Sequence, residues 1–114
     1  MGRRGRGGRG DDRRKDLQLC AQVRRTLDLA LAEASDERLL GAWVREVLPN
    51  PDVGRLRVVV EVGPEVDPDE VLGLLNAAQG HLRAEVAGAI HRKRTPDLMF
   101  QVVPRESGAG SREP

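Results

Sequence analysis

The segment LRVVVEV at residues 56–62 decides the fold of this chain, because it is the clearest strand in the sequence. Its side chains alternate with a period of two, so that one face carries Arg57 and Glu61 and the other carries Leu56, Val58, Val60 and Val62. Valine is branched at Cβ and suits a pleated sheet. We therefore predict a strand that packs one apolar face against a core.

A helix and a second strand precede this segment. Residues 43–48 form a shorter apolar run, and residues 49–54 (PNPDVG) form a turn, because the prolines fix φ and Gly54 tolerates a positive φ. The two strands are expected to pair as an antiparallel hairpin. Further upstream, apolar residues recur at three- and four-residue steps, as in a helix that ends at the polar turn Asp36–Arg38. These residues are Leu17, Cys20, Ala21, Leu27, Ala30, Leu31 and Ala34.

Two helices and a last strand follow it. Asp67 can cap a helix that has Pro68 at its first position and Glu70 three residues after the cap. Gly80 interrupts the helical pattern, which indicates either a bend or close approach that a Cβ would block, or a simple helix C-cap. The next helix ends in the basic run His91–Arg94, and residues 98–103 form the last strand. The order α-β-β-α-α-β predicts one α+β domain with two layers.

Charge is distributed unevenly along the chain. Residues 1–15 hold seven basic and two acidic residues, a net +5, whereas the remaining residues hold twelve basic and sixteen acidic, a net −4. Arginine and glycine at this density bury no apolar surface, so residues 1–14 are expected to be a disordered Arg/Gly-rich arm and residues 105–114 a disordered tail. The folded domain is then residues 15–104. A basic arm on an acidic body is a known sign of nucleic-acid contact, and it is also common in tails without a specific role.

The sequence offers no catalytic or metal-binding motif. It contains no P-loop, no nucleophile elbow and no paired Cys or His at metal-ligand spacing, and His81 and His91 are too far apart on one predicted helix to share a metal. Cys20 is the only cysteine and falls on an apolar helix face, so we expect it in the core of a cytoplasmic protein. No apolar run approaches the length of a membrane span. We expect no enzyme activity, no cofactor, no metal, no membrane contact and no small-molecule substrate.

The C-terminal half resembles the ribosome-binding factor A family. The resemblance rests on GHLRAEV at residues 80–86, on RKRTPDLMF at residues 92–100 and, more weakly, on DERL at residues 36–39, and it covers about residues 15–104. It implies a type II KH-like fold in which three helices back a three-stranded sheet. A kink at Ala78-Gln79-Gly80 would then replace the usual Gly-x-x-Gly loop. It also implies a monomeric, non-catalytic factor of ribosome biogenesis that binds the immature small ribosomal subunit and aids late maturation and processing of its 16S rRNA.

The basic residues of the last helix are the candidate RNA-binding site. Arg83 lies in the helix interior, and Arg92, Lys93 and Arg94 cluster at its end. With only two aromatic residues, Trp43 and Phe100, recognition would depend on phosphate contacts and backbone shape rather than base stacking. The residues alone favour another interpretation, in which the cluster complements the helix dipole and aids solubility.

An alternative function is a non-RNA module for protein interaction or regulation, whose acidic body meets a protein partner. Each phosphate contact releases counterions, so a steep loss of RNA affinity with salt would favour the RNA-binding hypothesis. Absence of RNA binding at low salt would favour the alternative.

Overall fold

The computed structural model of the chain describes residues 3–105, and the side chains of residues 14–105. Its elements follow the predicted order, with one additional short helix where a polar turn was expected at residues 36–38. In chain order they are α1 (Arg3–Ala32), α2 (Glu37–Leu40), β1 (Trp43–Pro49), β2 (Arg55–Val62), α3 (Pro68–Ala77), α4 (Gln79–Ala89) and β3 (Asp97–Pro104).

The three strands form one mixed sheet in the order β1-β2-β3. β1 and β2 pair antiparallel, as predicted, whereas β3 runs parallel to β2, with Leu98 opposite Leu56 and Phe100 opposite Val58. A bulge at Arg45 shifts the register of β1. The extra residue lets Val44 and Val47, which are three positions apart, both lie in the core.

The turn between β1 and β2 differs in detail from the prediction. No glycine within the described part of the chain has a positive φ, so Gly54 does not use that freedom. Instead, the Asp52 carboxylate accepts a hydrogen bond from the Gly54 amide at 2.8 Å and closes the turn.

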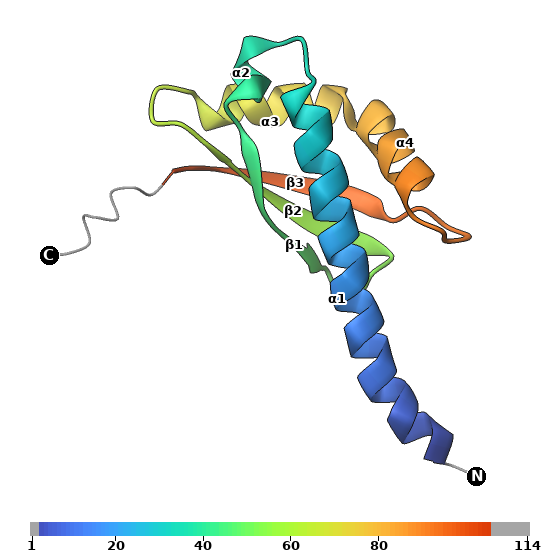
Figure 1. Cartoon of the computed structure of the whole chain (residues 1–114). Coiled ribbons are helices and arrows are strands. Elements are labelled where there is room, and N and C mark those ends of the chain that lie inside the picture. The colour runs from blue at the N-terminus through green and yellow to red at the C-terminus, as the bar shows by residue number, and fades with distance from the viewer. Residues whose placement is uncertain (1–2, 106–114) are drawn as a thin grey trace, which may run out of the picture.

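One apolar core joins the helices to one face of the sheet (Figure 1). The predicted face of β2 is completely buried, whereas Arg57 on the other face is exposed. Side chains from α1, α3 and α4 cover that buried face. The core residues of the helices are Leu19, Cys20, Val23, Leu27, Leu31, Leu39, Val71, Leu75, Leu82 and Val86, and Ile90 joins them directly after α4.

Helix α1 buries most of the predicted apolar stripe, including Cys20, Leu27 and Leu31, but not the whole of its first part. Leu17 is 66% exposed and Ala21 is also exposed, whereas Leu19 and Val23 are buried. The prediction for Leu17 and Ala21 was therefore wrong. They lie one turn apart on a row that faces away from the sheet, and several phases of a 3.6-residue period fit a sequence this rich in alanine and leucine.

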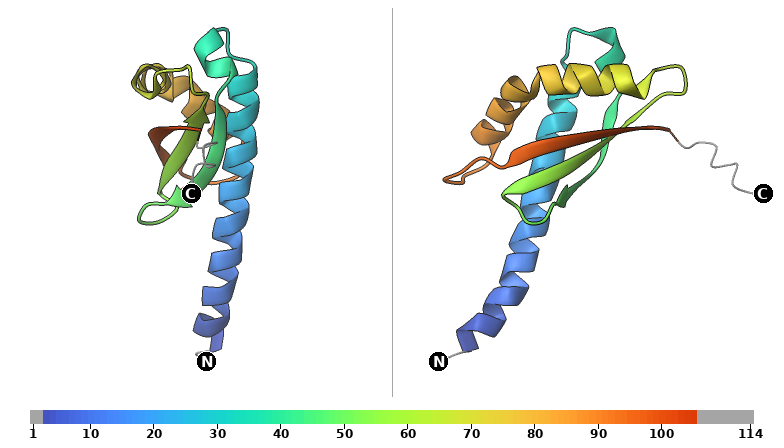
Figure 2. Two further views of the ribbon diagram at one scale, coloured as in Figure 1. Left: turned by 90° about the vertical axis from the view of Figure 1, so that its left-hand side faces the viewer. Right: turned by 180° about the vertical axis from the view of Figure 1, so that it is seen from behind.

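The N-terminal part of α1 differs from the disorder expected for residues 1–14. The helix begins at Arg3, and its first turns extend past the sheet in both views of Figure 2. Once a helix is anchored by its packed turns, each further residue adds a hydrogen bond without a new nucleation step. At the other terminus, Arg105 donates its amide to Val62 O at 2.8 Å and places its guanidinium 5.4 Å from the Trp43 ring centroid. The rest of the expected tail, residues 106–114, lies outside the described residues.

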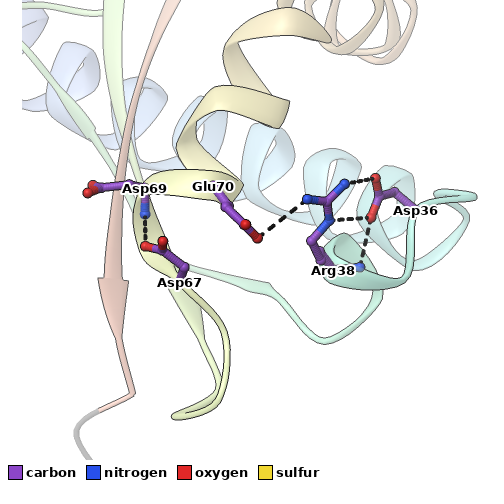
Figure 3. Close-up of polar contacts among 5 residues, drawn as sticks. All are labelled: Asp36, Arg38, Asp67, Asp69 and Glu70. Atoms are coloured by element: carbon purple, nitrogen blue, oxygen red, sulfur yellow. Dashed lines mark hydrogen bonds and ion pairs between the residues drawn. The ribbon is translucent and has the colours of Figure 1, made fainter.

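Polar contacts tie the helix starts together (Figure 3). The Asp36 carboxylate caps α2 by accepting from the Arg38 amide at 2.9 Å and also binds the Arg38 guanidinium, which lowers the pKa of that carboxyl. The Arg38 guanidinium also lies 3.4 Å from the Glu70 carboxylate of α3. Glu70 therefore contacts α2, although its place three residues after the Asp67 cap is typical of a side chain that bonds back to the cap residue. Asp67 caps α3 as predicted, accepting from the Asp69 amide at 2.9 Å.

Candidate nucleic-acid interface

The basic run lies in a loop and not at the end of a helix. Helix α4 ends at Ala89, and Ile90 adopts an extended backbone because its side chain turns into the core. Residues 91–95, called here the basic loop, connect it to β3 (Figure 1). Arg92, Lys93 and Arg94 are all exposed in this loop. The expectation that the run occupies the last helical turn was therefore wrong, and the three cations project from a loop into solvent.

Arg83 holds the basic loop against α4. Its guanidinium donates to Thr95 O at 2.9 Å and to Pro96 O at 3.2 Å, and it lies 3.4 Å from the Asp97 carboxylate. Pro96 itself is fully buried. The Arg83 side chain is still 44% exposed, so part of its donor fork remains open to solvent. The sequence suggested Arg83 as an RNA contact. In the structure its hydrogen bonds position the basic loop.

The break between α3 and α4 falls at Ala78. Ala78 is both the last cap of α3 and the first cap of α4. Gly80 lies inside the first turn of α4, does not have a positive φ, and has nothing within 4 Å of the place where a Cβ would stand. The predicted break at Ala78-Gln79-Gly80 is therefore present, but it falls at Ala78, and Gly80 itself is neither closely packed within the chain nor the C-cap.

Gly80 instead lines a shallow depression in the surface of the domain. Gly80, Arg83, Ala84, Ala87 and Thr95 line a hollow of about 240 Å³ beside the basic loop. The small residues at 80, 84 and 87 recur at four- and three-residue steps, so they share one face of α4. A face without long side chains lets another molecule's backbone approach the helix closely.

Sequence reasoning missed three residues of this region. Ala84 and Ala87 could have been found from their spacing to Gly80. Gln79 donates its side-chain amide to Leu98 O and fastens the start of α4 to β3. No local signal reveals that contact, because its partner lies nineteen residues away in the sequence.

The described residues offer little for catalysis. Cys20 is buried in the core as predicted, and burial, with a smaller contribution from Asp16, raises the pKa of its thiol. His81 is exposed and lies 3.6 Å from Glu85. Among residues with described side chains, no group of three or more potential metal ligands gathers. No helix within residues 3–105 is long and apolar enough to cross a membrane.

The fold and its loop define a type II KH-like α+β domain, with helices on one face of a mixed three-stranded sheet and a broken helix pair before β3. No family model matches the chain. It is 30% identical to ribosome-binding factor A of Solibacter usitatus over 92 residues, which cover 79% of this chain and 75% of that protein. It is 33% identical to ribosome-binding factor A of Halorhodospira halophila over 89 residues, covering 75% and 71%.

A solved structure agrees with these relatives. The crystal structure of ribosome-binding factor A from Thermus thermophilus superposes with a TM-score of 0.69 at 29% identity, covering 76% of this chain and 93% of that one. The chain belongs to the ribosome-binding factor A family, as the resemblance implied.

Proposed function

We propose that this protein is a ribosome assembly factor that binds the immature small ribosomal subunit through its rRNA and aids late maturation of that RNA. The observation that carries the proposal is the exposed basic loop, which Arg83 fixes beside the small-residue depression of α4. An RNA backbone can lie in the depression and place its phosphates against Arg92, Lys93 and Arg94. The names of the relatives support a ribosomal target.

The protein acts in this proposal as a monomeric cytoplasmic binding module without a catalytic step, a cofactor or a small-molecule substrate. Its affinity comes from phosphate contacts, since the two aromatic residues are not available as a stacking platform. Phe100 is buried in the core, and Trp43 is half-buried under Arg105 on the sheet. Recognition then follows the shape of the RNA backbone.

Reversing the charge of the basic loop tests the proposal. The triple variant Arg92→Glu, Lys93→Glu and Arg94→Glu should fold like the wild type, because exposed charges contribute little to stability. Co-sedimentation with immature small subunits should be lost, and the slope of log affinity against log salt should fall by about 2, at roughly 0.7 for each phosphate contact. The matched control makes the same charge change at scattered exposed sites, Arg25→Glu, Arg57→Glu and Arg105→Glu, and should bind more strongly than the loop variant.

The depression has its own matched pair of variants. Gly80 and Gly88 are both exposed positions of α4 where an added Cβ would have nothing within 4 Å, and only Gly80 lines the depression. Gly80→Gln should weaken RNA binding, whereas Gly88→Gln should leave it unchanged.

If the loop variant binds small subunits at wild-type strength, the RNA interface lies elsewhere, and the protein-interaction module becomes the better interpretation.

A further inference from the structure

The other flank of α4 forms a groove with α1. Two adjoining hollows of about 510 and 470 Å³ lie along the contact between these helices, and both are lined by Ala30, Glu33 and Glu85. One extends toward Leu29 and Gly88, the other toward Ser35 and α2. Figure 1 shows α1 and α4 side by side along this length. The groove is open because its lining is rich in alanine and glycine, which leave space between the two helix backbones.

An exposed apolar side chain stands at one end of this groove. Leu29 is 65% exposed although it neighbours the buried core residues of α1. Ala30, Ala84 and Ala89 continue the apolar surface across to α4. A leucine that projects into a groove offers a partner apolar area to bury at the centre of an interface.

The charged side chains that line the groove are acidic. They are Glu33, Glu85 and Asp36, of which Asp36 is paired with Arg38 at 3.0 Å, and no lysine or arginine among the described residues lines either hollow. His81 is the only other titratable side chain that lines it, and it lies against Glu85 at 3.6 Å. Such a surface repels phosphates and attracts cations. The depression lies on the neighbouring flank of α4 and shares only Ala84 with the groove. Its charged lining residue is Arg83, so the two surfaces differ in charge and select different partners.

We propose that the α1–α4 groove docks a lysine- or arginine-rich segment of a protein partner. The segment packs an apolar side chain against Leu29 while its cations face Glu33 and Glu85. This is the helix-in-groove or extended-segment mode of peptide recognition, with charge setting the orientation. The site adjoins the proposed RNA-binding surface at Ala84 and has no charged residue in common with it. Residues 1–14 of a second copy also carry cations, but Met1 is their only large apolar residue, so a partner segment with apolar side chains fits the groove better.

A labelled synthetic peptide is the probe. It has about 15 residues, enough for an amphipathic helix, with leucines on one face and lysines on the other. Fluorescence anisotropy with the full chain should show binding of this peptide and none of a peptide with glutamate in place of lysine. Amide chemical shifts should move on titration at Ala30, Gly88 and Ala89, which line the groove and not the depression. Shifts confined to the open face of the sheet or to the basic loop would overturn the proposal.

Matched variants locate the contact. Leu29→Asn should weaken peptide binding about tenfold, because it removes buried apolar area from the complex. Leu17→Asn changes an equally exposed leucine of the same helix, 66% against 65%, and should have no effect. Glu33→Gln with Glu85→Gln should also weaken binding, whereas the exposed pair Glu46→Gln with Glu65→Gln should not.

RNA binding and self-association separate the remaining outcomes. The Leu29 and Glu33/Glu85 variants should keep wild-type affinity for small-subunit RNA, so failure of the RNA proposal leaves this test intact. A protein that sediments as a dimer, and as a monomer after Leu29→Asn, would show that a second copy fills the groove and would overturn the proposal. Equal peptide affinity for the Leu29 and Leu17 variants would overturn it as well.

Discussion

Replacing Arg83 with methionine removes the guanidinium that ties the basic loop to α4 and keeps most of the aliphatic stem. The wild-type side chain donates to Thr95 O and Pro96 O, and both acceptors lie where the loop enters β3. Without these bonds the Pro96 carbonyl loses its partner beside a fully buried ring. The loop should then sample more conformations and present its cations less favourably to phosphates.

The size of the effect follows from the two hydrogen bonds. A bond from a charged donor contributes about 1.5–3 kcal/mol when it is shielded, and a neutral bond about 0.5–1.5 kcal/mol. Because the Arg83 side chain is 44% exposed, water competes for it and the lower range applies. We expect Arg83→Met to lower the free energy of unfolding by about 1–2 kcal/mol. For a domain of this size, that corresponds to a fall in melting temperature of roughly 5–10 °C.

Thermal unfolding followed by circular dichroism measures the stability, and co-sedimentation with small subunits measures the binding. Arg92→Met is the control, since Arg92 is exposed and makes no hydrogen bond within the described chain. It should weaken RNA binding without lowering the melting temperature, whereas Arg83→Met should lower both. An Arg83→Met protein that melts with the wild type would refute the anchoring role of Arg83 and leave it only the role of a direct RNA contact.

Three other changes test particular features of the fold. Gly80→Ala should raise the free energy of unfolding in urea by about 0.5–1 kcal/mol, because the position is helical and has space for a Cβ. A lower free energy of unfolding would mean that the fold needs this glycine. Asp67→Ala should lower the free energy of unfolding by about 1 kcal/mol, because it removes the N-cap of α3. An unchanged urea midpoint would show that the 2.9 Å hydrogen bond from the Asp69 amide to Asp67 does not stabilise the domain. Deleting residues 1–14 should leave the melting temperature unchanged, because the first buried side chain of α1 among residues 14–105 is Leu19. The deletion should weaken RNA binding and flatten its salt dependence, and an earlier melt would show that this segment supports the domain.

The sequence by itself determined the local elements and the family. The alternation in residues 56–62 marked β2 and its buried face, and the Asp67-Pro68 start marked α3, because strand period and helix capping are local properties. The motifs around residues 80–86 and 92–100 marked the ribosome-binding factor A family, which the relatives confirm. The four basic candidates were also identified from the sequence, since charge is visible without a structure.

Only the tertiary structure decided how these pieces face one another. β3 pairs in parallel with β2, and Arg83 donates a hydrogen bond to Thr95, but in both cases the partner lies far away in the sequence. Helix α1 buries Leu19 and exposes Leu17, although the sequence fits other orientations of the helix almost equally well. Periodicity says which side chains avoid water, but it does not say against what they pack. The loop position of residues 92–94 and the acidic groove between α1 and α4 follow from that packing, because the burial of Ile90 ends α4 and small side chains at the helix contact leave the groove open.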